Sequence, residues 1–240
     1  MKQFLPWTLL VAILNLSSLH AQTNATPPAS APSQADQEKR TLEKHSRPIL
    51  DALNLNNAGK EAKVRASLAE YLKALNAWHA TNDAEIKSLW NQFSKARTKQ
   101  DEAGANAALA KIDGVYASFK LDHDKFLSSL SSVLTPEQVE SVKDTLTVNK
   151  VKVTFDNYGK IFHGLTDEQN AFILKNLKSA REEAINAGTM TEKSAFFKKY
   201  KIKIEAYLTA HGYDVKQSYK EFIAKEKADA AKKKAAADNE

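Results

Sequence analysis

The stretch LAKIDGVYASFKLDHDKFLSSLSSV, residues 109–133, decides the fold. Apolar side chains, with one histidine among them, recur there in alternating steps of three and four residues. That spacing puts them on one face of an α-helix and is typical of a helix packed in a bundle. We therefore predict one long, unbroken helix, with a buried seam made of Leu109, Ile112, Tyr116, Phe119, His123, Phe126, Leu130 and Val133.

The same spacing continues on both sides of this stretch. Beyond residue 36 glycine is rare, and the only prolines are Pro48 and Pro136. Before this stretch, helices are predicted over residues 36–53, with a bend or break at Pro48, from a cap at Asn56 or Asn57 through His79, and over residues 83–97. After it, helices are predicted from residue 135 onward, from 166 to about Ala187, over residues 191–211, and after a cap at Asp214.

Two of these helices have nearly identical starts. LTPEQ at 134–138 and LTDEQ at 165–169 each place a threonine three residues before a glutamine, which is the capping-box pattern. Pro136 suits the first helical turn. Either the two copies form a degenerate repeat or the same cap occurs twice, and the loss of similarity beyond the cap favours the second interpretation.

One segment resembles a β-strand. Residues 147–158, TVNKVKVTFDNY, are rich in β-branched and aromatic side chains, but one strand cannot form a sheet. We expect an extended connection across the bundle. The predicted fold class is thus all-α, a single bundle of six to eight helices with one extended connecting segment.

The N-terminus has the order of a secretory signal peptide. Lys2 precedes an apolar run over residues 4–16, and small and polar residues follow as far as Ala21. The run is shorter than the roughly 20 residues of a membrane span, so cleavage after Ala21 is favoured over an uncleaved anchor. Residues 1–21 are the predicted signal peptide, 22–35 a flexible linker, 36–227 the helical domain and 228–240 a frayed Ala/Lys tail.

Composition narrows the classes of function. The chain has no cysteine, so it has no disulfide, no cysteine metal site and no lipid-acceptor thiol. We therefore expect a periplasmic or secreted protein without a stable membrane anchor after signal cleavage. The net charge of +6 comes from 35 basic and 29 acidic residues that alternate along the helices. This pattern is typical of solvated helix faces, and no nucleic-acid partner is expected.

Several segments carry a family resemblance. They are LTDEQNAFILKNLKSAREEAINAG at 165–188, KSAFFKKYKIKIEAYLTAHGYDVK at 193–216, ALNAWHATNDAEIK at 74–87 and LTPEQVESVKD at 134–144. Together they resemble a family of exported bacterial proteins, domain of unknown function 3826. Ile202 and Glu205 stand where that family would have glycine and asparagine. The resemblance implies that the protein is encoded among genes for plant-polysaccharide breakdown, and it implies no activity.

Three histidines occupy seam positions: His79, His123 and His211. Each needs partners for its ring nitrogens, because an unpaired buried polar group costs about 1–3 kcal/mol. A satisfied core histidine is the favoured interpretation, and an acid–base centre the alternative. Since no H-E-x-x-H motif or i, i+4 histidine pair is present, we predict no metal.

Arg181 starts from the core-facing stripe of its helix. A buried guanidinium needs a carboxylate partner, and the candidates are Glu182, Glu183, Glu205 and Asp214. A structural ion pair is favoured over a clamp for an anion or a sugar acid. Near the same end, aromatic and cationic side chains could form a sugar-binding surface, namely Trp78, Tyr200, Lys201, Tyr207 and Tyr213, but tyrosines at seam positions are more typical of a core in which the hydroxyl is hydrogen-bonded.

The sequence leans away from an enzyme. It has no nucleophile elbow, phosphate loop or triad order, and no cofactor is expected. We expect a non-enzymatic periplasmic accessory or binding protein in polysaccharide utilisation, with an acidic oligosaccharide or another periplasmic protein as partner. Two alternatives stay open: an ATP-independent periplasmic holdase chaperone, and a glycan-acting enzyme with Arg181 and the seam histidines. The ligand-binding residues would be Arg181, His79, His123, Lys201, Tyr207, His211, Tyr213 and Asp214.

Overall fold

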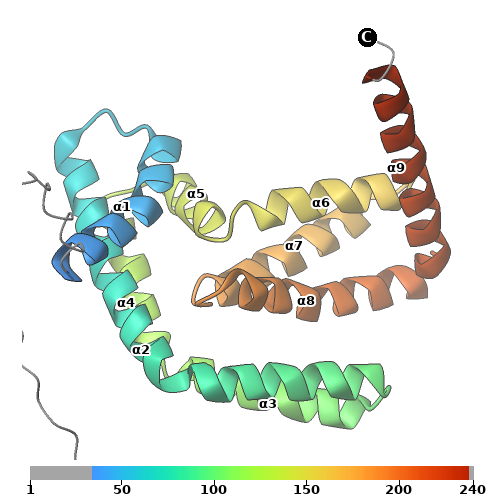
Figure 1. Ribbon diagram of the computed structural model, residues 1–240, viewed down its shortest axis with the longest axis horizontal. Helices are drawn as coiled ribbons and strands as arrows, with labels where there is room; N and C mark the ends of the chain where they lie inside the picture. The colour runs from blue at the N-terminus through green and yellow to red at the C-terminus, as the bar shows by residue number, and fades with distance from the viewer. Residues whose placement is uncertain (1–33, 238–240) are drawn as a thin grey trace, which may run out of the picture.

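The computed structural model describes residues 34–237, and this part of the chain forms nine α-helices and no strand (Figure 1). The predicted all-α class is confirmed, while the helix count exceeds the expected six to eight. The expected signal peptide and nearly all of the expected linker lie outside the described residues. Across residues 34–237, no helix combines the length and apolar character that crossing a membrane requires.

The second helix joins two elements that were predicted to be separate. Helix α1 (Gln34–Leu53) contains Pro48 without ending there. Helix α2 (Ala58–Thr98) is capped by Asn57, whose side chain accepts from the Lys60 amide at 2.9 Å. It then continues to Thr98 and changes direction part of the way along (Figure 1).

The middle of α2 holds polar side chains that bond to its own backbone. The Thr81 hydroxyl and the Asn82 amide both donate to the Trp78 carbonyl, at 2.9 and 2.7 Å. Side chains that bond back in this way often bend a helix. A polar stretch that suggested a break between two helices thus lies within one bent helix.

The predicted unbroken helix over 109–133 is wrong. The chain forms α3 (Glu102–Ala117) and α4 (Lys120–Ser131), with Ser118 and Phe119 between them. The physical reason is the bend in α2, since α3 packs along its second half and α4 along its first (Figure 1). A straight seam could not follow both halves. Phe119, at the break, still lies buried.

The predicted extended connection over 147–158 is also wrong. Helix α5 (Pro136–Leu146) is followed closely by α6 (Lys150–Ile161). Between α5 and α6, Val148 and Asn149 have left-handed backbone conformations, with φ of 50° and 55°. Val151, Tyr158 and Ile161 are buried at helical spacing. Burial of that face outweighs the weak helix propensity of the β-branched residues.

Of the last three helices, the first and the third begin at their predicted caps, while the second, expected from residue 191, begins one residue earlier, after a cap that was not foreseen. Helix α7 (Asp167–Ala184) and α5 both begin with complete capping boxes, at Thr166 and Thr135. Helix α8 (Met190–Ala210) starts from Thr189. Asp214 accepts from the Gln217 amide at 2.9 Å, at the start of α9 (Val215–Ala237). Helix α9 therefore includes most of the segment that was expected to fray.

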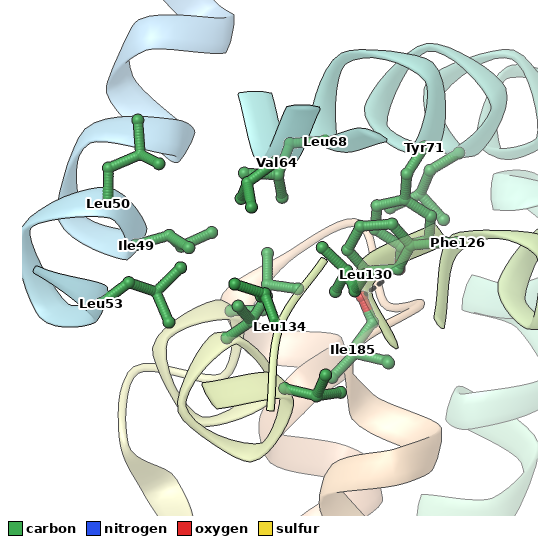
Figure 2. Close-up of a cluster of buried hydrophobic side chains, with 14 of the residues drawn as sticks. Ile49, Leu50, Leu53, Val64, Leu68, Tyr71, Phe126, Leu130, Leu134 and Ile185 are labelled. Atoms are coloured by element: carbon green, nitrogen blue, oxygen red, sulfur yellow. Dashed lines mark hydrogen bonds between the residues drawn. The ribbon is translucent and has the colours of Figure 1, made fainter. Parts of the chain in front are cut away.

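Buried side chains gather in two large clusters and one small one. The first cluster joins α1, the first half of α2, α4 and α5 (Figure 2). The second joins α6, α7 and α8 with Leu89 of α2 and Ile112 of α3. Ile185 belongs to the first cluster and Ala187 to the second. The connection between α7 and α8 therefore lies where the two clusters meet.

Candidate functional site

The α7–α8 connection, residues 185–189, is held by polar side chains from two other helices. From α2, the Tyr71 hydroxyl donates to the Ile185 carbonyl at 2.8 Å, and His79 Nε2 lies 2.8 Å from the Asn186 carbonyl oxygen. From α4, His123 Nδ1 lies 3.1 Å from Asn186 Oδ1. Tyr71, His79 and Asn186 are all buried. Two of the three seam histidines thus meet at one residue.

The same connection is also tied to α8 and α3. The Gly188 amide donates to Glu192 Oε2 at 2.7 Å, and the Tyr116 hydroxyl donates to the other oxygen of that carboxylate. Burial, and next the Glu192 charge, raise the pKa of Tyr116, so its hydroxyl stays protonated. These bonds satisfy backbone groups that a connection of this kind would otherwise leave unpaired.

His79 packs closely against this backbone. A Cβ on Gly188 would lie 3.0 Å from two atoms of the His79 ring, so a larger residue there would displace the imidazole. The other ring nitrogen, Nδ1, lies 2.6 Å from Asp83 Oδ1. A carbonyl and a carboxylate only accept, so a ring nitrogen of His79 that carries a proton has an acceptor on either side of the ring.

A cleft of about 330 Å³ opens beside the α7–α8 connection. It lies among α3, α4, the end of α7 and α8. Its lining carries four carboxylates against one lysine and one histidine, and the rings of Tyr116 and Phe196 pack edge to face at 5.0 Å. The lining residues are Asp113, Tyr116, Ala117, Lys120, His123, Asp124, Glu182, Glu183, Asn186 and Phe196.

The cleft carboxylates already have partners within the chain. Lys199 reaches Asp113 and Glu183, each at 2.9 Å, and the Tyr200 hydroxyl donates to Glu183 at 2.6 Å. Burial would lower the pKa of Lys199, but its hydrogen bonds to these two carboxylates outweigh burial and raise it. Asp124 pairs with Lys120. Lys199, which is not itself a lining residue, therefore holds Asp113 and Glu183, whereas Lys120 and Asp124 form an exposed pair on α4.

Arg181 lies behind the cleft, 1% exposed. Its guanidinium bonds to Asp144 at 2.7 Å, to Glu182 at 3.0 Å and to Glu140. Lys143 joins the network through Glu140 at 2.6 Å and Glu182 at 3.0 Å. Burial would raise the pKa of Glu140, but the hydrogen bonds from Lys143 and Arg181 lower it to about 2.

Of the four carboxylates that were predicted as ion-pair partners of Arg181, only Glu182 forms the pair. Of the other expected partners, Glu183 bonds to Lys199, Glu205 accepts from Tyr219 at 2.8 Å, and Asp214 caps α9. Glu140 and Asp144 were not foreseen. Their spacing of four residues on one helix, on either side of Lys143, is the signal in the sequence that could have suggested them.

The predicted site residues fall into two groups. His79 and His123 meet at Asn186, and Arg181 reaches the same cleft through Glu182. His211 is exposed, and its ring nitrogen lies 2.8 Å from the Tyr207 carbonyl oxygen. Its expected convergence with the other two histidines does not occur.

The remaining predicted residues take their contacts elsewhere. Tyr207 stacks on Phe172 at 3.8 Å. Lys201 lies over the Tyr219 ring at 4.7 Å, and the Tyr213 hydroxyl bonds to Gln169 at 3.3 Å. With Asp214, these side chains belong to the end of the molecule where α9 joins α6 and α8.

Sequence reasoning missed Asp113, Lys120 and Asn186 as cleft residues. Asp113 and Lys120 read as solvated positions beside the seam, and Asn186 follows a helix end. Among the described residues, no group of three or more histidine, aspartate or glutamate side chains is placed to hold a metal ion.

Two comparisons with known proteins complete this description. Residues 39–228 match the model of a family described as "Protein of unknown function (DUF3826)". A comparison with curated proteins finds no match.

Proposed function

This chain belongs to the DUF3826 family, and for it we propose a non-enzymatic role: an exported binding protein that holds a neutral oligosaccharide in the cleft beside the α7–α8 connection. One observation carries the proposal. The cleft combines polar groups that have fixed positions with two aromatic rings, in a volume of about 330 Å³. Ligand sites of this kind span about 300–1,000 Å³.

Sugar hydroxyls both donate and accept hydrogen bonds, and the cleft offers partners of both kinds. Its carboxylates accept, Lys120 donates, and His123 presents one ring nitrogen that has no partner among the described residues. The rings of Tyr116 and Phe196 supply apolar surface for the C–H faces of a sugar. Because ion pairs to Lys143 and Lys199 hold Glu182, Glu183 and Asp113, little ordering of these three carboxylates is needed when a ligand arrives.

Charge favours a neutral ligand over the acidic oligosaccharide suggested by Arg181. The two terminal nitrogens of Arg181 engage three carboxylates, its Nε is buried without a partner among the described residues, and the side chain has almost no exposed surface. The lining carries four carboxylates and a single lysine. A sugar acid would therefore find few cationic groups free to pair with its carboxylate, whereas uncharged hydroxyls would find acceptors.

The surroundings of the carboxylates favour binding over hydrolysis. A glycosidase acid needs apolar surroundings that keep its proton in place. Here Glu182, Glu183 and Asp124 each bond to a cationic side chain. Such carboxylates serve as hydrogen-bond acceptors, which is what a binding site requires.

Isothermal titration of the mature chain, starting at Gln22, tests the proposal against neutral xylo- and cello-oligosaccharides and against acidic oligogalacturonides. We expect heat of binding from a neutral series and none from the acidic one. His123→Ala and Asp113→Asn should each weaken binding about tenfold. His211→Ala replaces an exposed histidine outside the cleft and serves as the matched control.

Three outcomes would overturn the proposal. They are the absence of binding to every sugar, binding that both cleft variants leave unchanged, and release of shorter sugars during incubation, which would reveal an enzyme. Export is tested separately, by sequencing the N-terminus of the chain recovered from the periplasm of its host. Gln22 as the first residue is the expected result.

A further inference from the structure

The side-chain amide of Asn186 lies between two other polar groups. Its Oδ1 is 3.0 Å from the Tyr71 hydroxyl and 3.1 Å from His123 Nδ1. The same hydroxyl lies 2.8 Å from the Ile185 carbonyl oxygen. Tyr71 and Asn186 are buried, so every hydrogen in this group matters to its stability.

The Tyr71 hydroxyl has one proton and two oxygen neighbours. Burial raises the pKa of Tyr71, so the hydroxyl keeps this proton. The Ile185 carbonyl can only accept and is the nearer neighbour, so the proton belongs to that bond. If the Asn186 atom facing Tyr71 is the amide oxygen, no hydrogen is left to lie between that oxygen and the Tyr71 hydroxyl oxygen.

A half-turn of the Asn186 amide removes the deficit. Oδ1 and Nδ2 exchange places while the shape of the side chain stays the same. The NH₂ group then has two hydrogens for two acceptors, the Tyr71 hydroxyl oxygen and His123 Nδ1. We infer that Asn186 donates to both and thereby fixes neutral His123 as the tautomer with its proton on Nε2.

This tautomer gives the cleft a hydrogen-bond donor. His123 lines the cleft, and within residues 34–237 its Nε2 has no hydrogen-bond partner. The Nε2–H group therefore selects a ligand that places an acceptor oxygen there, such as a hydroxyl or ring oxygen of a sugar. This consequence rests on the proposed function, whereas the tautomer itself does not.

Asn186 is then a positioning residue that acts on the ligand through His123. Its backbone carbonyl accepts from His79 while its side chain donates to His123. A ligand without an acceptor at this point would leave the imidazole N–H unpaired in the cleft. Sites built around such a donor reject analogues that cannot pair with it.

The tautomer can be read directly by long-range ¹H–¹⁵N NMR of the full ¹⁵N-labelled chain above about pH 8, where histidine side chains are neutral. We expect His123 to carry its proton on Nε2. His211 is the internal control, because its Nδ1 faces a carbonyl at 2.8 Å and must carry the proton instead. A proton on His123 Nδ1 would overturn the inference.

Asn186→Asp makes the sharper test, because the shape is kept while the donor becomes an acceptor. We expect the proton of His123 to move to Nδ1, and the affinity for a xylo-oligosaccharide mixture to fall about tenfold. An unchanged tautomer in this variant would contradict the inference. If Asn186→Asp does not fold, Tyr71→Phe is the second test. Loss of the Tyr71 hydroxyl lets the Asn186 amide turn either way, so His123 should become a mixture of its two tautomers.

The control is Tyr207→Phe, because Tyr207 stacks on Phe172 away from the cleft. It should leave the tautomer of His123 unchanged.

The two readouts separate the two proposals. The NMR measurement needs no ligand, so an Nε2 proton on His123 supports the inference even if no sugar binds. A failed titration with that tautomer in place counts against the proposed function alone.

Discussion

At the scale of single residues, Arg181 shows what a buried charge requires of its surroundings. Its guanidinium is 1% exposed, and three carboxylates from two helices surround it. A buried ion pair adds little net stability over an apolar replacement, but removal of one partner leaves uncompensated charge. The three carboxylates are partly exposed, so water softens that penalty for them.

Replacement of Arg181 by methionine should therefore lower the free energy of unfolding by about 3 kcal/mol. Glu140, Asp144 and Glu182 would repel one another once the guanidinium is gone. Urea denaturation followed by circular dichroism measures the change. Arg47→Met removes an exposed arginine from α1 and should change stability by no more than about 0.5 kcal/mol. Equal effects in the two variants would show that the network does not stabilise the fold.

The same network predicts an acid-sensitive stability. The pKa of Glu140 is about 2 in the folded chain against 4.5 ordinarily, so the folded state prefers the ionised form. This contribution is present above about pH 4.5 and is lost as the pH falls towards 2. Urea midpoints measured between pH 6 and pH 2 should fall across that window. Glu140→Gln should flatten the fall, and an unchanged slope in that variant would contradict the assignment.

At the scale of elements, local signals in the sequence predicted helix starts better than helix extents. The capping boxes at Thr135 and Thr166 form as expected, because the cap and its partner lie within four residues. The break at Ser118 and the continuity of α2 were missed. Both follow from how α2, α3 and α4 pack against one another, which no window along the chain contains.

The connection between α5 and α6 holds backbone strain that a substitution can relieve. Val148 is a β-branched residue in the left-handed region, with φ of 50°. Its side chain is 51% exposed, so burial does little to offset the cost of that conformation. That conformation costs about 1–2 kcal/mol for a residue with a Cβ. Val148→Gly should thus raise the free energy of unfolding by about 0.5–1 kcal/mol.

Val153→Gly is the matched control for this prediction. Val153 is similarly exposed, but it lies within α6, where glycine should destabilise by about 0.5 kcal/mol. The two variants are expected to shift the thermal midpoint in opposite directions. A decrease in both would show that the left-handed conformation of Val148 is not strained.

At the scale of the whole molecule, the cleft depends on elements far apart in the sequence. Seam spacing predicted that His79, His123, His211 and Arg181 face inward; His79, His123 and Arg181 lie at or beside the cleft, but His211 is exposed. Which seam residues meet depends on the bend of α2. Asn186 joins the two histidines from a connection between helices, where spacing carries no information.

The outer part of α9 should contribute little to stability. Beyond Phe222 almost every described side chain is exposed, whereas Tyr213 and Tyr219 pack edge to face on Phe162. A chain that ends at Ala224 should unfold within about 0.5 kcal/mol of the full chain in urea. A chain that ends at Gly212 loses both tyrosines and should be clearly less stable. Equal stabilities for the two shortened chains would refute this division of α9.

Helix α2 supplies Leu68 to one buried cluster and Leu89 to the other, so a single run of backbone hydrogen bonds belongs to both. Unfolding of one cluster alone would expose buried side chains of α2, the helix against which the other cluster packs. The two should therefore open as one cooperative unit, and amide protons near the middle of α2 should exchange with deuterium only when the entire chain unfolds.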